Sequence, residues 1–209
     1  MGRAAITGIV GPVAFLTVAF TLAVLRPDLI RSEGWASWPS SMALGGGAGV
    51  IQVIAFLCLA CCYPVFALAA IRPVLGNVAA WGGFLGIAAG DALLAFPTDA
   101  AGVGPSWHGS LHLAGVVLAT AASIVAAAGV TSATLRDPMW QPWRWVGAPS
   151  IAVACVIGAV AGFDVAWAKV VYVLGITLPV PLVALLLIRS STARPTSATP
   201  FDRVRATTR

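Results

Sequence analysis

Apolar runs close to 20 residues long and nearly free of charged side chains are the feature that most restricts how this chain folds. Hydrophobic residues make up 59% of the 209 positions and charged residues only 9%, whereas about a quarter of the residues in a soluble domain are charged. A helix needs about 20 mostly apolar residues to cross the hydrocarbon core of a bilayer. Because unpaired backbone groups are costly in lipid, these runs are expected to be helical. The sequence therefore predicts an all-α, polytopic bundle of transmembrane helices.

Six spans are expected, with prolines at the breaks between them, because proline ends a helix or occupies its first turn. The predicted spans are 4–25, 47–71, 77–96, 106–131, 145–163 and 166–188. A break is expected at Arg72–Pro73, and Pro179 and Pro181 predict a kink inside the last span. Residues 1–188 thus form one predicted six-helix transmembrane domain, and residues 189–209, rich in Ser, Thr, Pro and Arg, a predicted disordered basic cytoplasmic tail.

The distribution of basic residues predicts the orientation in the membrane. With the N-terminus inside, nine arginines fall on the inner side and three basic residues, Arg26, Arg31 and Lys169, on the outer side. The positive-inside rule then places both termini in the cytoplasm, which agrees with an even number of spans. Lys169 is interpreted as an interfacial lysine that reaches the lipid headgroups. The net charge of +5 is explained by orientation and headgroup contact, so the bilayer is the expected partner and nucleic acid is not.

Tryptophans are expected near both membrane interfaces, as in an aromatic belt. The predicted outer members are Trp35, Trp38, Trp107 and Trp167, and the predicted inner members are Trp81, Trp140, Trp143 and Trp145.

Three glycines at a spacing of four, Gly82, Gly86 and Gly90, lie on one face of the third predicted span. Small residues at this spacing let a neighbouring helix approach closely. The third span is therefore expected to be central, and packing within one chain is favoured over a homodimer.

One ionisable residue stands clearly inside a predicted span. Asp91 lies near the outer end of the third span, and His112 lies at a similar depth in the fourth. Charged groups within a bilayer are rare and costly, so each is a functional hypothesis. We predict that Asp91 and His112 meet, as a ligand-binding pair or as the acid and base of a catalytic pair.

Asp99 and His108 extend this candidate site. His108 and His112 are spaced i to i+4 and share a helix face. Together, Asp91, Asp99, His108 and His112 would offer two carboxylates and two imidazoles to a divalent metal such as zinc. The alternative is structural: an Asp91–His112 hydrogen bond between two helices, with Asp99 capping a helix or a turn.

The segment Gly90-Asp91-Ala-Leu-Leu-Ala-Phe96-Pro97-Thr98-Asp99, followed by Trp107-His108-Gly109-Ser110-Leu111-His112, resembles the DUF998 family of bacterial membrane proteins. The resemblance implies six spans, a Phe-Pro-x-Asp signature at the end of one span and a His-rich opening of the next. It implies no reaction. High Ala, Gly and Arg with a single Lys is typical of a GC-rich bacterial genome, and we expect a multi-pass protein of the bacterial plasma membrane.

A looser comparison is with the alkaline-ceramidase-like membrane hydrolases, which use histidines, an aspartate and a serine around zinc. This chain departs from them in having six expected spans instead of seven and only two histidines.

The sequence is compatible with three functions. The first is a protein that binds a lipid headgroup or small apolar ligand at the outer Asp/His site. The second is a membrane-embedded enzyme, either a metal-assisted lipid hydrolase or an acid–base catalyst on an isoprenoid-like substrate. The third is a proton-coupled carrier, which is weakened by the lack of a polar trail toward the inner side.

Overall fold

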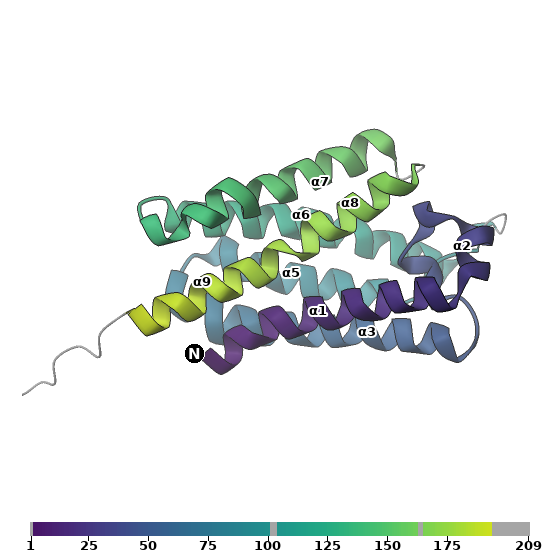
Figure 1. Cartoon of the computed structure of the whole chain (residues 1–209), viewed down its shortest axis with the longest axis horizontal. Helices are drawn as coiled ribbons and strands as arrows, with labels where there is room; N and C mark the ends of the chain where they lie inside the picture. The colour runs from purple at the N-terminus through teal and green to yellow at the C-terminus, as the bar shows by residue number, and fades with distance from the viewer. Residues whose placement is uncertain (1, 101–103, 163–164, 194–209) are drawn as a thin grey trace, which may run out of the picture.

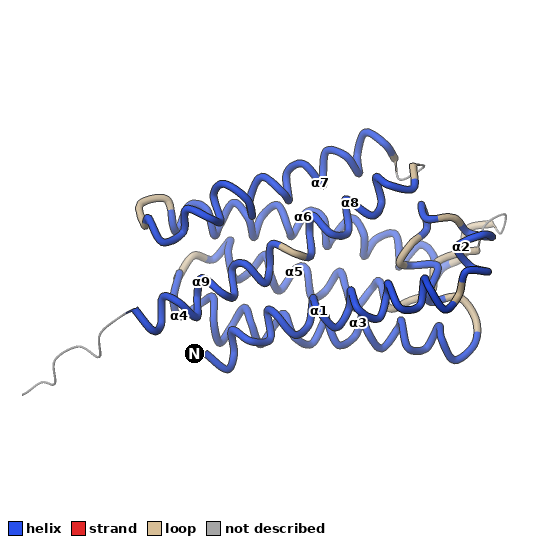
Figure 2. Tube along the Cα trace, viewed as in Figure 1, coloured by secondary structure: helices blue, strands red, loops and turns tan. Residues whose placement is uncertain are grey.

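The chain folds into a bundle of long helices. The computed structural model describes residues 2–100, 104–162 and 165–193, and every regular element within these ranges is helical. The long helices lie side by side along one axis (Figure 1), and the loops gather at the two ends of the bundle, apart from the short break between two helices of the last span (Figure 2). The prediction of an all-α bundle is confirmed.

Five helices are long and apolar enough to cross a membrane, and they make this a multi-pass membrane protein. They are Gly2–Leu25, Gly46–Leu75, Trp107–Thr134, Pro138–Ala161 and Ala166–Thr192. A sixth apolar helix, α5 (Val78–Leu94), has 17 residues, and at a rise of about 1.5 Å per residue it covers most of a hydrocarbon core of about 30 Å. About six spans result, as the sequence predicts.

Several of these spans are composite. The first span is α1 (Gly2–Leu25) and the fourth is α6 (Trp107–Thr134). The second joins α3 (Gly46–Phe66), a π-helical turn η3 (Ala67–Ile71) and α4 (Arg72–Leu75). The fifth joins η4 (Pro138–Trp140), η5 (Trp143–Gly147) and α7 (Ala148–Ala161), and the sixth joins α8 (Ala166–Thr177) and α9 (Pro179–Ala193).

Prolines affect the helix ends in two different ways. The predicted break at Arg72–Pro73 is wrong, because the helix continues to Leu75 and ends at Gly76, whose φ of 64° is the left-handed conformation that glycine adopts readily. The π-helical turn just before Pro73 changes the hydrogen-bond register where that residue offers no N–H. In the last span, α8 and α9 are interrupted at Leu178, directly before Pro179, which is where the kink is predicted.

The boundaries of the last two spans also differ from those predicted. The fifth span begins at Pro138, seven residues earlier than expected, because η4 and η5 continue directly into α7. Helix α9 continues to Ala193, so the first residues assigned to the disordered tail are helical. The rest of that tail, 194–209, and the predicted end of the fifth span at 163 lie outside the described residues.

The N-terminus and the end of α9 lie at the same end of the bundle (Figure 1), as an even number of spans requires. This end carries the basic residues that predict a cytoplasmic position, and we call it the inner end. The opposite end, which bears α2 (Pro27–Glu33), is the outer end.

Helices α5 and α6 make the most extensive helix–helix contact in the described part of the chain. A Cβ added at Gly83 would lie 2.5 Å from the backbone nitrogen of Ala126, and one at Gly90 would lie 2.7 Å from that of Ala119. Gly82, in contrast, has open space around it. The predicted small-residue stripe therefore exists, but it runs through Gly83, Gly86 and Gly90 and not through Gly82.

Residues 34–44 fold back over the outer end of the bundle, and we call this segment the outer cap. It contains two 3-10 turns, η1 (Trp35–Ser37) and η2 (Ser40–Ala43), and contacts α1, α3 and α8. Trp38 is fully buried, and its indole N–H donates to the carbonyl of Ala19 at 3.2 Å. The predicted belt position of Trp38 is wrong, because the cap carries its side chain into the bundle instead of toward lipid headgroups.

Two inner tryptophans also differ from the predicted belt. Trp140 and Trp143 are each 2% exposed, and Trp143 donates to the hydroxyl of Thr131 at 3.0 Å. The connection between α6 and α7 packs them into the core. Trp107, Trp145 and Trp167 remain largely exposed on the bundle surface, as a belt requires.

Candidate functional site

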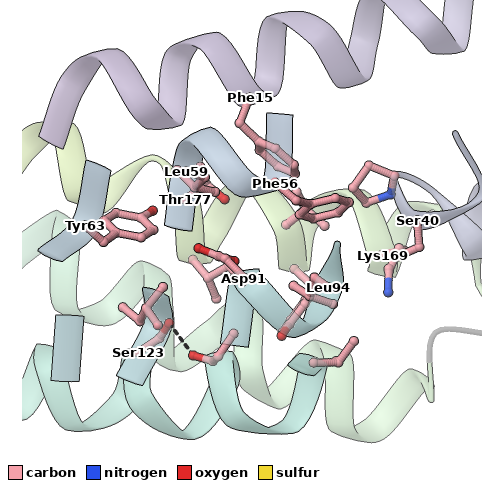
Figure 3. Close-up of a pocket in the computed structure, with 17 residues that line it drawn as sticks. Phe15, Ser40, Phe56, Leu59, Tyr63, Asp91, Leu94, Ser123, Lys169 and Thr177 are labelled. Atoms are coloured by element: carbon pink, nitrogen blue, oxygen red, sulfur yellow. Dashed lines mark hydrogen bonds between the residues drawn. The ribbon is translucent and has the colours of Figure 1, made fainter. Parts of the chain in front are cut away.

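Asp91 lies in the last turn of α5 and faces a cavity inside the outer half of the bundle. Its side chain is buried, with 5% exposed, and one of its carboxylate oxygens has no hydrogen-bond partner among the described residues. The cavity has a volume of about 50 Å³ and is bounded by α1, α3, α5, α6, α8 and the outer cap. Figure 3 shows the carboxylate directed into this space, which we call the Asp91 cavity.

Hydroxyl side chains form part of the wall of the Asp91 cavity. Both tyrosines of the chain, Tyr63 and Tyr172, line the cavity together with Ser123 and Thr177. Figure 3 shows the hydroxyls of Tyr63 and Thr177 on the side of the cavity toward which Asp91 points. Ser123 donates to the carbonyl of Ala119 at 2.8 Å. The site thus offers a carboxylate and neutral hydroxyl groups in place of the expected imidazoles.

Lys169 lines the same cavity from α8. It is 8% exposed, and its ammonium lies 5.8 Å from the centre of the Tyr172 ring. The interpretation of Lys169 as a headgroup-reaching interfacial residue is therefore wrong, because the first turns of α8 pack beneath the outer cap. The hydroxyl of Tyr172 forms a hydrogen bond with the hydroxyl of Thr120, and this bond connects α8 to α6.

A second space, which we call the outer vestibule, adjoins the Asp91 cavity. It has a volume of about 220 Å³ and is lined by the cap, the loop residue Thr98, α6 and α8. Ser40, Val116 and Lys169 line both spaces, so these residues form the boundary between them. Leu113, which also lines the vestibule, is 63% exposed. The vestibule therefore reaches the molecular surface, and the Asp91 cavity lies behind it.

His112 does not pair with Asp91. Its Nδ1 lies 2.7 Å from the carbonyl of Phe96, and its Nε2 lies 2.7 Å from the hydroxyl of Ser40. Because a carbonyl only accepts, Nδ1 carries the proton and Nε2 accepts from Ser40. The predicted Asp91–His112 contact is wrong, since both ring nitrogens are occupied elsewhere. His112 instead fastens the outer cap to α6 and to the loop after α5.

Asp99, Ser106 and His108 form a separate network at the start of α6. The carboxylate of Asp99 accepts from the backbone N–H of Ser106 at 3.1 Å and from its hydroxyl at 2.5 Å. The Ser106 oxygen in turn accepts from the N–H of Gly109 at 3.0 Å and so caps the helix. His108 Nδ1 lies 3.1 Å from the carbonyl of Pro97 and 2.9 Å from the Ser106 oxygen. The structural alternative is thus confirmed for Asp99, which stabilises a helix start.

This network contains a serine, a histidine and an aspartate, but it lacks the order of a nucleophilic triad. Ser106 donates its proton to Asp99, and His108 Nδ1 must carry a proton to reach the Pro97 carbonyl. The serine hydroxyl is therefore held by a carboxylate, and the protonated Nδ1 of His108 is not placed to act as its general base, as nucleophilic catalysis by a triad requires.

The predicted metal site is not formed. Across the described ranges, no group of three or more His, Cys, Asp or Glu side chains is placed to hold a metal ion. Asp99 and His108 approach to 3.8 Å, but His112 is engaged by Phe96 and Ser40, and Asp91 faces its own cavity. The four residues were expected to converge because they are close in sequence, and the helix faces separate them.

The hydrogen bonds from Ser106 hold the pKa of Asp99 below its ordinary value. A carboxyl whose pKa is lowered on folding stabilises the fold above its ordinary pKa, and this contribution is lost as the pH falls through the lowered value. We therefore expect Asp99→Asn to lower the melting temperature near neutral pH, with the difference from wild type closing in acid. Melting curves across pH in detergent measure it, and a gap that is constant with pH would contradict the ionised cap.

Sequence reasoning found Asp91 and missed most of its surroundings. The signal that was available is the placement of hydroxyl side chains in the middle of apolar runs, as at Tyr63, Ser123, Tyr172 and Thr177. Ser40 carried no such signal, because it enters the site through the folded cap.

In comparisons with known proteins, no protein-family model, no curated protein sequence and no solved structure matches this chain. The resemblance to the DUF998 family therefore stays a prediction.

Proposed function

We propose that this protein, placed in the bacterial plasma membrane, binds a ligand through an amino group that enters from the outer side and contacts Asp91. The observation that carries the proposal is the buried carboxylate oxygen without a hydrogen-bond partner among the described residues, directed into a cavity. A buried charge is strongly unfavourable unless a cation or donors compensate it. Ionisable groups within a membrane accordingly mark ligand and ion sites.

The size of the cavity restricts the group that binds there. A volume of about 50 Å³ has room for roughly three to four water molecules, whereas benzene occupies an engineered cavity of about 150 Å³. An ammonium group fits, and an isoprenoid or acyl chain does not. The proposed ligand is therefore a lipid headgroup or a small molecule that has a cationic end.

The two alternative functions find less support in the site. An enzyme would need the metal set or the Asp91–His112 pair, and neither arrangement is present in the described residues. A proton-coupled carrier would need a polar route to the inner end. The neighbouring cavity that shares Ile87, Ser123 and Ile176 with the Asp91 cavity has a volume of about 10 Å³, and aliphatic and aromatic side chains line it apart from Ser123.

Binding of a simple primary amine tests the proposal. We expect ethanolamine to bind the purified wild-type protein saturably in isothermal titration, and the isosteric Asp91→Asn to weaken binding at least about tenfold, as for a charge-assisted hydrogen bond. Asp28→Asn is the matched control, because Asp28 is an exposed outer carboxylate that forms an ion pair with Arg26 at 2.9 Å. Equal binding by Asp91→Asn and wild type would overturn the proposal, and so would the absence of binding by every primary-amine probe.

A further inference from the structure

The boundary between the Asp91 cavity and the outer vestibule carries a positive charge, that of Lys169, which restricts the ligands that can extend from one space into the other. Lys169 lines both spaces, so a molecule with its amino group at Asp91 has its remaining part beside the lysine. Two ammonium groups at close range repel each other, and the repulsion is stronger where solvent is excluded. A molecule that also brings a negative group to this boundary is therefore favoured over a simple amine.

The vestibule has the room and the chemistry for such a group. Its volume of about 220 Å³ is several times that of the Asp91 cavity at about 50 Å³. Thr98 contributes a hydroxyl to its lining, and Lys169 contributes the positive charge. A phosphate offers several acceptor oxygens to donors of this kind, and lysine binds phosphate as a point charge. Ser40 and Ser37 add little, because their hydroxyls donate to His112 and to the Glu33 carbonyl.

The nearest acidic side chain of the adjoining loop does not oppose an anion in this space. Asp99 directs its carboxylate onto Ser106, at 3.1 Å from the backbone nitrogen and 2.5 Å from the hydroxyl, and it does not line the vestibule. The charged group that lines the space is thus the Asp91 carboxylate inside the bundle and the Lys169 ammonium at the boundary with the vestibule.

We propose that the ligand is an amino-alcohol phosphate, with its primary ammonium group at Asp91 and its phosphate at Lys169 and Thr98 in the outer vestibule. This inference rests on the proposed function and deepens it by naming the ligand class. The same chemistry occurs in free phosphoethanolamine and in the headgroup of an ethanolamine phospholipid. Lys169 is the residue that selects this class over simple amines.

Titration of two probes against a set of variants tests the inference. Wild type is expected to bind phosphoethanolamine at least about tenfold more tightly than ethanolamine. Lys169→Met is expected to remove this preference, chiefly by weakening phosphoethanolamine binding, and Lys169→Arg is expected to retain it because the charge is kept. Arg31→Met is the control for a change of charge at the outer end, and size-exclusion chromatography shows whether each variant is folded.

The outcomes separate the inference from the proposed function. If ethanolamine binds as tightly as phosphoethanolamine and Lys169→Met alters neither, while Asp91→Asn weakens both, the zwitterion is overturned and the amine site stands. If neither probe binds, the retention of lipid is measured instead, by native mass spectrometry after reconstitution in nanodiscs of phosphatidylethanolamine or phosphatidylglycerol. Retention of phosphatidylethanolamine by wild type and its loss in Lys169→Met supports the headgroup as the source. Equal retention of both lipids, or of neither, overturns the inference, and the absence of every probe overturns the amine site as well.

Discussion

Gly83→Ala is expected to destabilise the folded protein by about 1–3 kcal/mol, the usual cost of forcing a methyl group into a well-packed core. The new Cβ would lie 2.5 Å from the backbone nitrogen of Ala126 and 2.6 Å from its Cα. Backbone atoms cannot rotate away as a side chain does, so α5 and α6 must separate. Thermal unfolding in detergent, followed by circular dichroism, measures the loss.

Gly82→Ala provides a matched control one residue away on the same helix. No atom lies within 4 Å of a Cβ placed there, and alanine favours a helix over glycine by about 0.5–1 kcal/mol. The control is therefore expected to melt at or slightly above the wild-type temperature. Equal melting temperatures for the two variants would show that α5 and α6 do not approach as closely as described.

The same glycines show where sequence reasoning loses resolution. Small residues at Gly82, Gly83, Gly86 and Gly90 fit two adjacent stripes, and helix periodicity alone does not choose between them. In a soluble protein the polar face of a helix identifies its buried face. Lipid removes that contrast, because the outward face is as apolar as the inward one. The presence of a close helix contact was predictable, and its rotation was not.

In the candidate site, too, one part was predictable from the sequence and another part was not. Asp91 was predictable from its charge, because an ionisable group inside an apolar span is rare whatever surrounds it. Its neighbours were not, because they depend on helix rotation and on residues far away in sequence. Lys169, for example, reaches the site from α8, and proximity in sequence instead favoured His108 and Asp99. Those two residues are close to each other, but they serve the start of α6.

The outer cap is the element that sequence patterns missed altogether. The segment of residues 34–44 is short, mixed in polarity and rich in turn-forming residues, and such a composition is typical of an exposed connection. Trp38 was therefore assigned to the membrane interface, where tryptophan is common. Its burial depends on a space left between the ends of α1, α3 and α8, and that space exists only once the bundle has formed.

Trp38→Ala is accordingly expected to be among the most destabilising single substitutions in the outer half of the protein, at about 3–5 kcal/mol for the loss of a buried aromatic side chain. The indole is fully buried, packs 4.7 Å from the ring of Phe20 and donates to the Ala19 carbonyl at 3.2 Å. Trp35→Ala is the control, because Trp35 belongs to the same cap and is 36% exposed. Melting temperatures of the two variants give the comparison.

The effect of Trp38→Ala should extend to the ligand site, because the cap that Trp38 anchors also forms one wall of the Asp91 cavity. Ser40, two residues further on, lines both spaces and donates to His112. If the cap is held in place by Trp38, binding of phosphoethanolamine weakens in Trp38→Ala under conditions where the variant is still folded, and remains near wild type in Trp35→Ala. A Trp38→Ala protein that melts earlier but binds with unchanged affinity would show that the helices alone shape the site and that the cap contributes only stability.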